Sequence, residues 1–187
     1  MKVRDITYIA LFAAVMGTLG LVPPITLSFT PVPITLQTLG VLLSGGVLGA
    51  RLGGWSQIVF LLLVAAGIPL LSGGRGGMSV FVGPSAGYLL GYPIIAFCLG
   101  YIISRYRVLT FWKVLFTNLT VGVFLLYVFG VPVQAFIMNI PLIQTIKLSL
   151  IYIPGDILKA ILASYLVYKL RKSPVLYNQV SKASETQ

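Results

Sequence analysis

Two ionisable side chains lie inside an otherwise apolar stretch near the end of the sequence. Asp156 and Lys159 stand within the run 142–168, and Asp156 lies roughly 20 Å from both ends of a helix of that length. A spacing of three places both side chains on one helix face. Pro154 and Gly155 directly before them should loosen the helix, and the free N–H groups of a new turn favour an ionised carboxylate. Because charges in an apolar medium are costly, such residues face a cavity or a partner.

Two interpretations of this pair are open. In the first, the ion pair neutralises itself and only holds its helix in a bundle. In the second, Asp156 accepts hydrogen bonds from N–H groups of a solute, and Lys159 holds a carboxylate or a polar oxygen. Gln37 is a further candidate for binding, since its amide both donates and accepts. A polar residue at a water interface is the alternative for Gln37.

The rest of the sequence offers little material for catalysis. It has no histidine and one cysteine, which excludes a His/Cys metal cluster, a Ser-His-Asp triad and an intramolecular disulfide. Of the three acidic residues, Asp5 and Glu185 lie near the termini, so no interior carboxylate pair is available for acid–base chemistry. The phosphate-binding pattern G-x-x-x-x-G-K-[ST] is missing too. We therefore expect a protein that is not an enzyme and that uses no cofactor or metal.

The composition is that of a membrane protein. The 187 residues are 58% hydrophobic and 9% charged, whereas soluble domains carry about a quarter charged residues. The mean hydropathy is +1.01. The net charge is +10, but the basic residues lie between apolar runs and not in one stripe. This distribution indicates the lipid bilayer as a partner and gives no indication of nucleic acid.

Six apolar runs are candidates for transmembrane helices, each of which needs roughly 20 mainly apolar residues. The runs are 6–22, 34–50, 53–71, 86–103, 114–131 and 142–168. They leave almost no room for a soluble domain. The prediction is therefore an all-α integral membrane protein, with residues 1–187 forming a single six-helix membrane domain that ends in a polar tail at 173–187.

Basic residues orient these spans, because cytoplasmic flanks carry an excess of Lys and Arg. Ten of them fall on one side of the predicted membrane: Lys2, Arg4, Arg51, Arg105, Arg107, Lys113, Lys169, Arg171, Lys172 and Lys182. The other side has Arg75 in a loop and Lys147 at the start of the last span. We expect both termini and the tail to be cytoplasmic, in a multi-pass protein of a bacterial-type plasma membrane.

Two connections on the opposite side have unusual compositions. Residues 22–35 contain four prolines, which restrict the backbone and predict a stiff extended lid. Residues 72–87 are rich in glycine, which permits positive φ and a close approach of the backbone to another group. A flexible surface loop is the alternative for this second segment.

Four segments of the sequence together resemble the BioY family, the biotin-binding substrate component (S-component) of energy-coupling-factor (ECF) transporters. They are P-V-P-I-T-L-Q-T-L-G at 31–40, G-I-P-L-L-S-G-G-R-G-G at 67–77, G-P-S-A-G-Y at 83–88 and I-P-G-D-I-L-K-A at 153–160. The resemblance covers nearly the whole chain. It implies a six-helix, high-affinity subunit that captures biotin outside the cell and delivers it inward together with a transmembrane coupling protein and two cytoplasmic ATPases.

The resemblance also implies site residues. Asp156 and Lys159 would line the biotin pocket, and the third segment adds Tyr88. The glycine loop, residues 73–77, would line it as well, with Gly73, Gly74, Gly76, Gly77 and Arg75. Ala10 and Ala14 in the first span match the small residues that dock on the coupling protein. The pattern of small residues taken alone favours the alternative, packing of these alanines within the bundle.

One departure from the family concerns the cation that binds the carboxylate of biotin. Arg75 stands where some relatives carry a neutral polar residue, and Leu89 where some carry an arginine. We therefore expect the cation in the loop and not on the helix.

A different function, an ion-coupled secondary transporter of a small carboxylate-bearing solute, would need a protonatable relay. The interior of the sequence offers one Asp and no His or Glu, which gives little support for such a relay.

Overall fold

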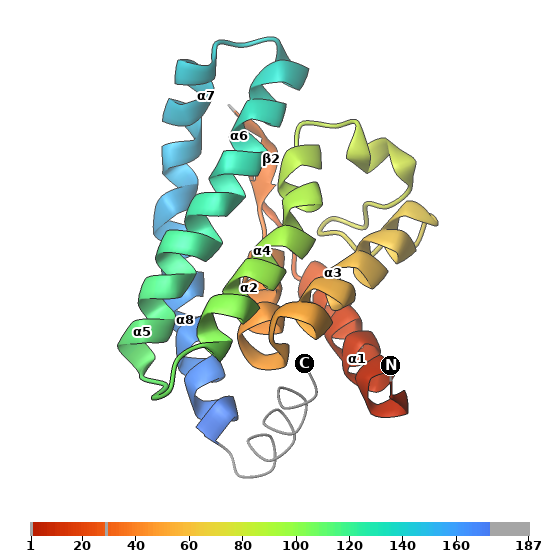
Figure 1. The fold of residues 1–187 in the computed structure, drawn as a ribbon. Helices are drawn as coiled ribbons and strands as arrows, with labels where there is room; N and C mark the ends of the chain where they lie inside the picture. Colours follow the sequence, from red (N-terminus) through yellow and green to blue (C-terminus); the bar gives the residue numbers. More distant parts are fainter. Residues whose placement is uncertain (1, 29, 173–187) are drawn as a thin grey trace.

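Helices make up most of the computed structural model, which describes residues 2–28 and 30–172 (Figure 1). Their bounds are α1 Val3–Gly20, α2 Gln37–Leu48, α3 Ala50–Ala65, α4 Ala86–Ser104, α5 Phe111–Thr117, α6 Phe124–Met138, α7 Leu142–Ser149 and α8 Ile153–Lys172. The π-helix η2, Asn118–Val123, joins α5 to α6, and the 3-10 helix η3, Leu150–Tyr152, joins α7 to α8. Apart from the four-residue 3-10 helix η1, Met78–Phe81, the described residues thus form six helical stretches, as predicted.

Four of these stretches are long and apolar enough to cross a membrane: Val3–Gly20, Ala86–Ser104, Phe111–Met138 and Leu142–Lys172. The other two, α2 and α3, are shorter apolar helices. Helix α2 lies inside the expected run 34–50. Helix α3 begins three residues before the expected run 53–71 and ends six residues before the end of that run. The expected tail 173–187, with Lys182, lies outside the described residues.

A short β-hairpin forms the proline-rich connection. Strand β1, Ile25–Leu27, pairs antiparallel with β2, Thr30–Ile34. Prolines 31 and 33 have no N–H group for a helix and restrict the residues before them to extended conformations. The extended backbone predicted for this connection is therefore present, in the form of a hairpin.

The N-terminal helices pack with their backbones in close contact. A Cβ atom added at Gly100 in α4 would lie 2.3 Å from the backbone N of Ala50, and one at Gly45 in α2 would lie 2.4 Å from the carbonyl oxygen of Ala96. Any side chain at these two positions would push α4 away from α2 and α3. This tight packing fixes the helices that carry the site described below.

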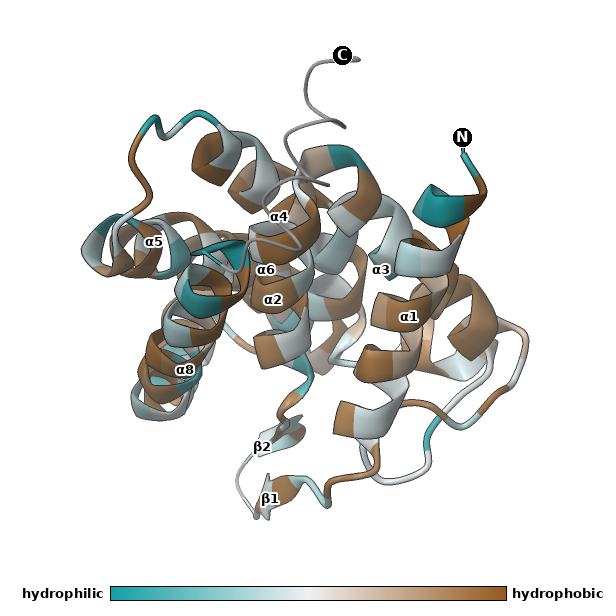
Figure 2. Ribbon diagram, turned by 90° about the horizontal axis from the view of Figure 1, so that it is seen from below, coloured by the Kyte–Doolittle hydropathy of each residue, from teal (hydrophilic) through white to brown (hydrophobic). Residues whose placement is uncertain are grey.

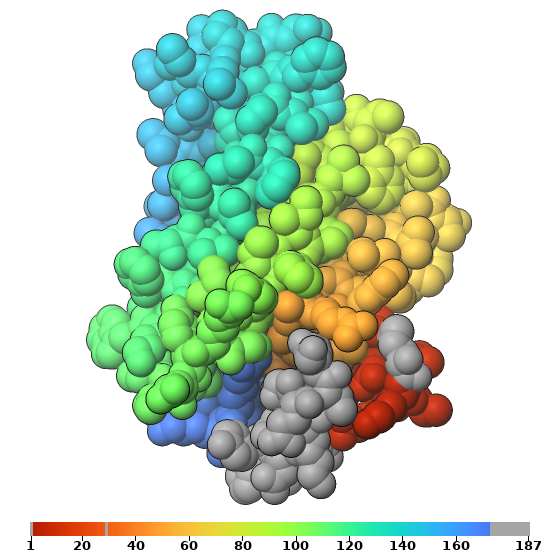
Figure 3. Space-filling model, viewed as in Figure 1, coloured from red at the N-terminus to blue at the C-terminus, as the bar shows by residue number. Residues whose placement is uncertain are grey.

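The two ends of the molecule differ in charge. One end, here called the basic end, holds the start of α1, the α2–α3 junction, the α4–α5 connection and the end of α8 (Figures 1 and 2). Val47, Ile103, Val114 and Val167 form a buried cluster there. The opposite end, the loop end, holds the hairpin, the glycine loop and the α6–α7 connection, which rises beyond its surroundings in Figure 3. The predicted separation of basic residues therefore matches the two ends of the fold.

Candidate functional site

A cavity lies between β2, the start of α2, α4, α6 and α8. It encloses about 570 Å³ of free space, part of it open to solvent. Its apolar wall includes Val32, Ile34, Leu71, Leu89 and Leu126. Its polar groups come from Thr35, Gln37, Thr38, Arg75, Ser85, Tyr88, Tyr92, Tyr127, Tyr152, Asp156 and Lys159. Five residues singled out in the sequence thus meet at one cavity: Gln37, Arg75, Tyr88, Asp156 and Lys159.

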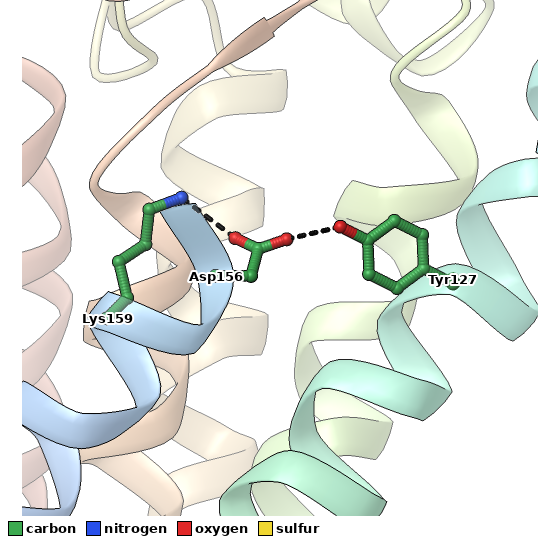
Figure 4. Close-up of polar contacts among 3 residues, drawn as sticks. All are labelled: Tyr127, Asp156 and Lys159. Atoms are coloured by element: carbon green, nitrogen blue, oxygen red, sulfur yellow. Dashed lines mark hydrogen bonds and ion pairs between the residues drawn. The ribbon is translucent and has the colours of Figure 1, made fainter. Parts of the chain in front are cut away.

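The acidic centre of the cavity is Asp156, in the first turn of α8. The helix restarts at Ile153 after η3, which places Pro154 in a first turn, where a missing N–H group costs least. Lys159 Nζ lies 2.9 Å from Asp156 Oδ1, and the Tyr127 hydroxyl donates to Oδ2 at 2.6 Å (Figure 4). Asp156 is 5% exposed and Lys159 8%. The pair is therefore an internal ion pair and also part of the cavity wall.

Tyr127 and Tyr152 were not singled out from the sequence. Tyr152 donates to the carbonyl oxygen of Val32 at 3.0 Å and is hydrogen-bonded to Thr30, so it ties η3 to strand β2. Its position four residues before Asp156 on one helical stretch was a usable signal. Tyr127 had none, because it comes from another span and the chain has ten tyrosines.

Tyr88 faces the same cavity from α4. Its hydroxyl donates to Gln134 Oε1 at 2.9 Å, which links α4 to α6. Its ring meets that of Tyr127 edge to face, with 6.5 Å between the ring centroids. The two rings together form an apolar part of the cavity wall with polar hydroxyl edges.

Gln37, the first residue of α2, is 2% exposed, which does not fit a residue at a water interface. Its Nε2 donates to the carbonyl oxygens of Leu70 at 3.0 Å and of Met16 at 3.4 Å. Its Oε1 lies 3.5 Å from the backbone N of Ser72. Gln37 therefore fixes the segment that leads into the glycine loop to the end of α1, and it borders the cavity at the same time.

The glycine loop forms a tight turn. The backbone N–H groups of Leu71 and Arg75 each donate to the other residue's carbonyl oxygen, at 3.0 and 3.2 Å. Gly73, Gly74 and Gly77 have φ of 80°, 69° and 84°, a region that favours glycine. A Cβ atom at Gly76 would lie 2.5 Å from the carbonyl oxygen of Ile68. These four glycines are not among the described residues that line the cavity; they shape the turn that brings Arg75 to its wall.

Arg75 is half-buried at the cavity and donates from Nε to the carbonyl oxygen of Ser72 at 3.2 Å. Within residues 2–28 and 30–172, the one ion pair is Asp156–Lys159, so no carboxylate of this part of the chain neutralises Arg75. Leu89 also lines the cavity and is 4% exposed. The loop therefore supplies a cation to a wall where α4 presents leucine.

The small residues of α1 divide between two faces. Ala13, Gly17 and Gly20 are buried in the bundle, whereas Ala10 and Ala14 are exposed on the outer surface. Packing within the bundle therefore does not use Ala10 or Ala14. Their exposed face remains free for another membrane-embedded helix.

Fold and site together define a helical membrane protein with a polar-lined cavity near the loop end. Residues 1–174 match the BioY family. A Bacillus subtilis protein, described as a probable biotin transporter BioY, is 49% identical over 173 residues, 92% of this chain and 93% of the relative. A biotin transporter BioY from Rhizobium etli is 42% identical over 175 residues, 89% of this chain and 92% of the relative.

A solved structure resembles the whole fold. The crystal structure of the S-component for biotin from an ECF-type ABC transporter covers 91% of this chain and 92% of its own, with a TM-score of 0.88 and 37% sequence identity. The chain belongs to the BioY family. The predicted family and the predicted class, a multi-pass helical membrane protein of a transporter and not an enzyme, are confirmed.

Proposed function

We propose that this chain is the biotin-binding S-component of an ECF-type transporter. The observation that carries the proposal is the cavity itself, with the buried Asp156–Lys159 pair on α8 and Arg75 on the glycine loop. It occurs in a chain whose fold matches an S-component for biotin over 91% of its length.

The chemistry of biotin fits these groups. Its ureido ring has two N–H donors and a carbonyl acceptor, and its flexible tail ends in a carboxylate. Asp156 accepts from the ureido N–H groups, because two hydrogen bonds leave capacity on its oxygens. Lys159 holds the carbonyl oxygen, while the rings of Tyr88 and Tyr127 pack against the bicycle.

Arg75 holds the carboxylate of the tail. A guanidinium grips a carboxylate through two parallel N–H bonds, and only the Nε–H group of Arg75 is used within the turn. The turn that contains Gly73, Gly74, Gly76 and Gly77 holds Arg75 at the cavity wall, where the tail would end. Gln37 keeps that turn in place through Leu70.

Transport driven by ATP would need partners that hydrolyse it, since the sequence of this chain has no phosphate-binding loop. The partners are a transmembrane coupling protein and two cytoplasmic ATPases. The exposed alanines Ala10 and Ala14 form the contact with the coupling protein, because small side chains let two helix backbones approach closely.

Uptake of radiolabelled biotin by cells without their own biotin transporter tests this function. The chain is expressed alone, with the coupling protein and ATPases, and with ATPases inactivated in their phosphate-binding loops. We expect uptake with the active ATPases, insensitive to an ionophore that collapses ion gradients. Uptake by the chain alone that stops with the ionophore would instead establish an ion-coupled secondary transporter.

A further inference from the structure

Cations and tyrosine rings are paired at the basic end. Among the described residues, four cation–π contacts occur, and all four lie there: Arg105 with Tyr101, Lys113 with Tyr106, Lys169 with Tyr165 and Lys172 with Tyr168. The distances from the cation to the ring centroid run from 4.4 Å for Arg105 to 5.8 Å for Lys169. Each cation is thus held beside a ring.

These pairs come from two segments that meet at the start of α5. Val114 of α5 is fully buried against Ile103 of α4 and Val167 of α8. The connection from α4 to α5 carries Arg105 and Arg107, the first turn of α5 carries Lys113, and the last turn of α8 carries Lys169 and Lys172. Seen from this end, hydrophilic colour marks the α4–α5 connection and the end of α8, on either side of α5 (Figure 2). We call these five residues the basic cluster.

The basic cluster has no compensating acid in the described part of the chain. The carboxylates there are Asp5 and Asp156. Asp156 is paired with Lys159 inside the cavity, and Asp5 accepts from the backbone N–H of Lys2 at the start of α1. All five cations of the cluster are exposed, so their charge is available to a partner.

The exposed residues next to the basic cluster are apolar and aromatic, as is typical of a protein surface at the membrane interface. Trp112, next to Lys113, is 72% exposed, and Phe116 one turn further is 67% exposed. Tryptophan and tyrosine concentrate at the depth of lipid headgroups, and long basic side chains extend from the apolar region to that depth. A partner of the cluster therefore has both an anionic group and an apolar body.

We propose that the basic cluster is a binding site for the headgroup of an anionic phospholipid. The lipid phosphate accepts hydrogen bonds from Arg105 and Lys113 on one side and from Lys172 on the other. Its acyl chains lie along the exposed aromatic surface at the start of α5. Basic pockets between transmembrane helices bind anionic headgroups in this way. The proposal does not depend on the bound solute of the cavity.

Native mass spectrometry of the detergent-purified full chain tests it. The protein is titrated with dioleoyl-phosphatidylglycerol, and separately with dioleoyl-phosphatidylcholine, which has the same acyl chains but no net charge. The test variant is R105Q/K113Q/K172Q. The control variant K2Q/R51Q/K147Q removes the same charge from exposed positions outside the cluster.

The wild type and the control variant should retain phosphatidylglycerol in preference to phosphatidylcholine. The test variant should bind phosphatidylglycerol about a hundredfold more weakly, at about fivefold per cation removed. Equal loss in both variants would reduce the effect to overall charge and overturn the proposal, as would equal binding of both lipids by wild type. A far-UV circular-dichroism spectrum and a thermal unfolding midpoint equal to those of the control variant show that the test variant is folded.

Two further measurements distinguish a bound lipid from a free anion and from a protein partner. Inorganic phosphate should not displace phosphatidylglycerol from the wild type; displacement at millimolar phosphate would make this a free-anion site. If the test variant keeps its lipid but no longer co-purifies with the coupling protein and ATPases, the cluster is a protein-docking surface and the lipid proposal is wrong.

Discussion

The Tyr127 hydroxyl on α6 donates to Asp156 Oδ2 on α8 at 2.6 Å, while Lys159 occupies Oδ1 at 2.9 Å. The carboxylate is thus fixed from two spans, and each of its oxygens has accepted one hydrogen bond (Figure 4). A carboxylate has about four lone-pair positions, so capacity remains for N–H groups of a ligand. The side-chain rotamer of Asp156 is fixed before a ligand binds, which lowers the entropic cost of binding.

Removing the Tyr127 hydroxyl should therefore weaken binding without removing any charge. We expect Tyr127→Phe to raise the Kd for biotin about tenfold, since a hydrogen bond to a charged group contributes about 1.5 kcal/mol. Isothermal titration calorimetry measures this change. Tyr165→Phe, on the exposed face of α8, is the control and should bind as wild type does. An unchanged Kd for Tyr127→Phe would show that the hydroxyl does not orient the acceptor.

Replacing the acceptor itself should have a larger effect. Asp156→Asn turns a charge-assisted acceptor into a neutral amide and leaves Lys159 buried and unpaired, so we expect biotin affinity to fall by about a hundredfold or more. The double variant Asp156→Asn/Lys159→Met separates binding from folding, because it removes the unpaired charge. If the double variant regains both thermal stability and biotin binding, the pair is only structural.

Arg75 is predicted to act on one functional group of the ligand. Arg75→Ala should weaken biotin about tenfold and scarcely change the affinity for biotin amide, whose tail has no negative charge. Lys147→Gln, the other basic residue near the loop end, is the control and should affect neither ligand. Equal losses for both ligands would mean that Arg75 only shapes the glycine loop, and Lys159 would then be the better candidate for the carboxylate.

The exposed face of α1 is predicted to matter for transport and not for binding. Ala10→Trp and Ala14→Trp should leave the Kd for biotin unchanged but abolish uptake in cells that contain the coupling protein and ATPases, because a large ring holds helices apart. Leu162→Trp, at an exposed apolar position of α8, controls for a bulky residue facing lipid. Full uptake by both the Ala10→Trp and the Ala14→Trp variant would show that this face of α1 does not dock on the coupling protein.

Much of the fold follows from composition and spacing. Asp156 and Lys159 were predicted to share a helix face because a spacing of three requires it, and the apolar runs predict six helical stretches because backbone polar groups in a bilayer must be satisfied internally. The positive φ of Gly73, Gly74 and Gly77 agrees with the glycine content of the loop.

Contacts between spans could not be predicted in the same way. Tyr127 reaches Asp156 across 29 positions of sequence, and Tyr152 reaches Val32 across 120. No local pattern specifies such pairs, because they depend on how the helices pack. Proline at positions 31 and 33 predicts extended backbone but not its pairing into a hairpin with β1. The exposure of Ala10 and Ala14 likewise depends on which face of α1 meets the bundle.

We expect the cavity at Asp156, Lys159 and Arg75 to bind biotin without help from another protein. Titration calorimetry of biotin into the detergent-purified chain, with neither nucleotide nor metal present, measures this most directly. We predict saturable heat at one site and a thermal stabilisation equivalent to about 2.7 kcal/mol when free biotin is at about a hundred times its Kd. A folded, monodisperse preparation that shows neither heat nor stabilisation with biotin would show that the isolated chain does not bind biotin.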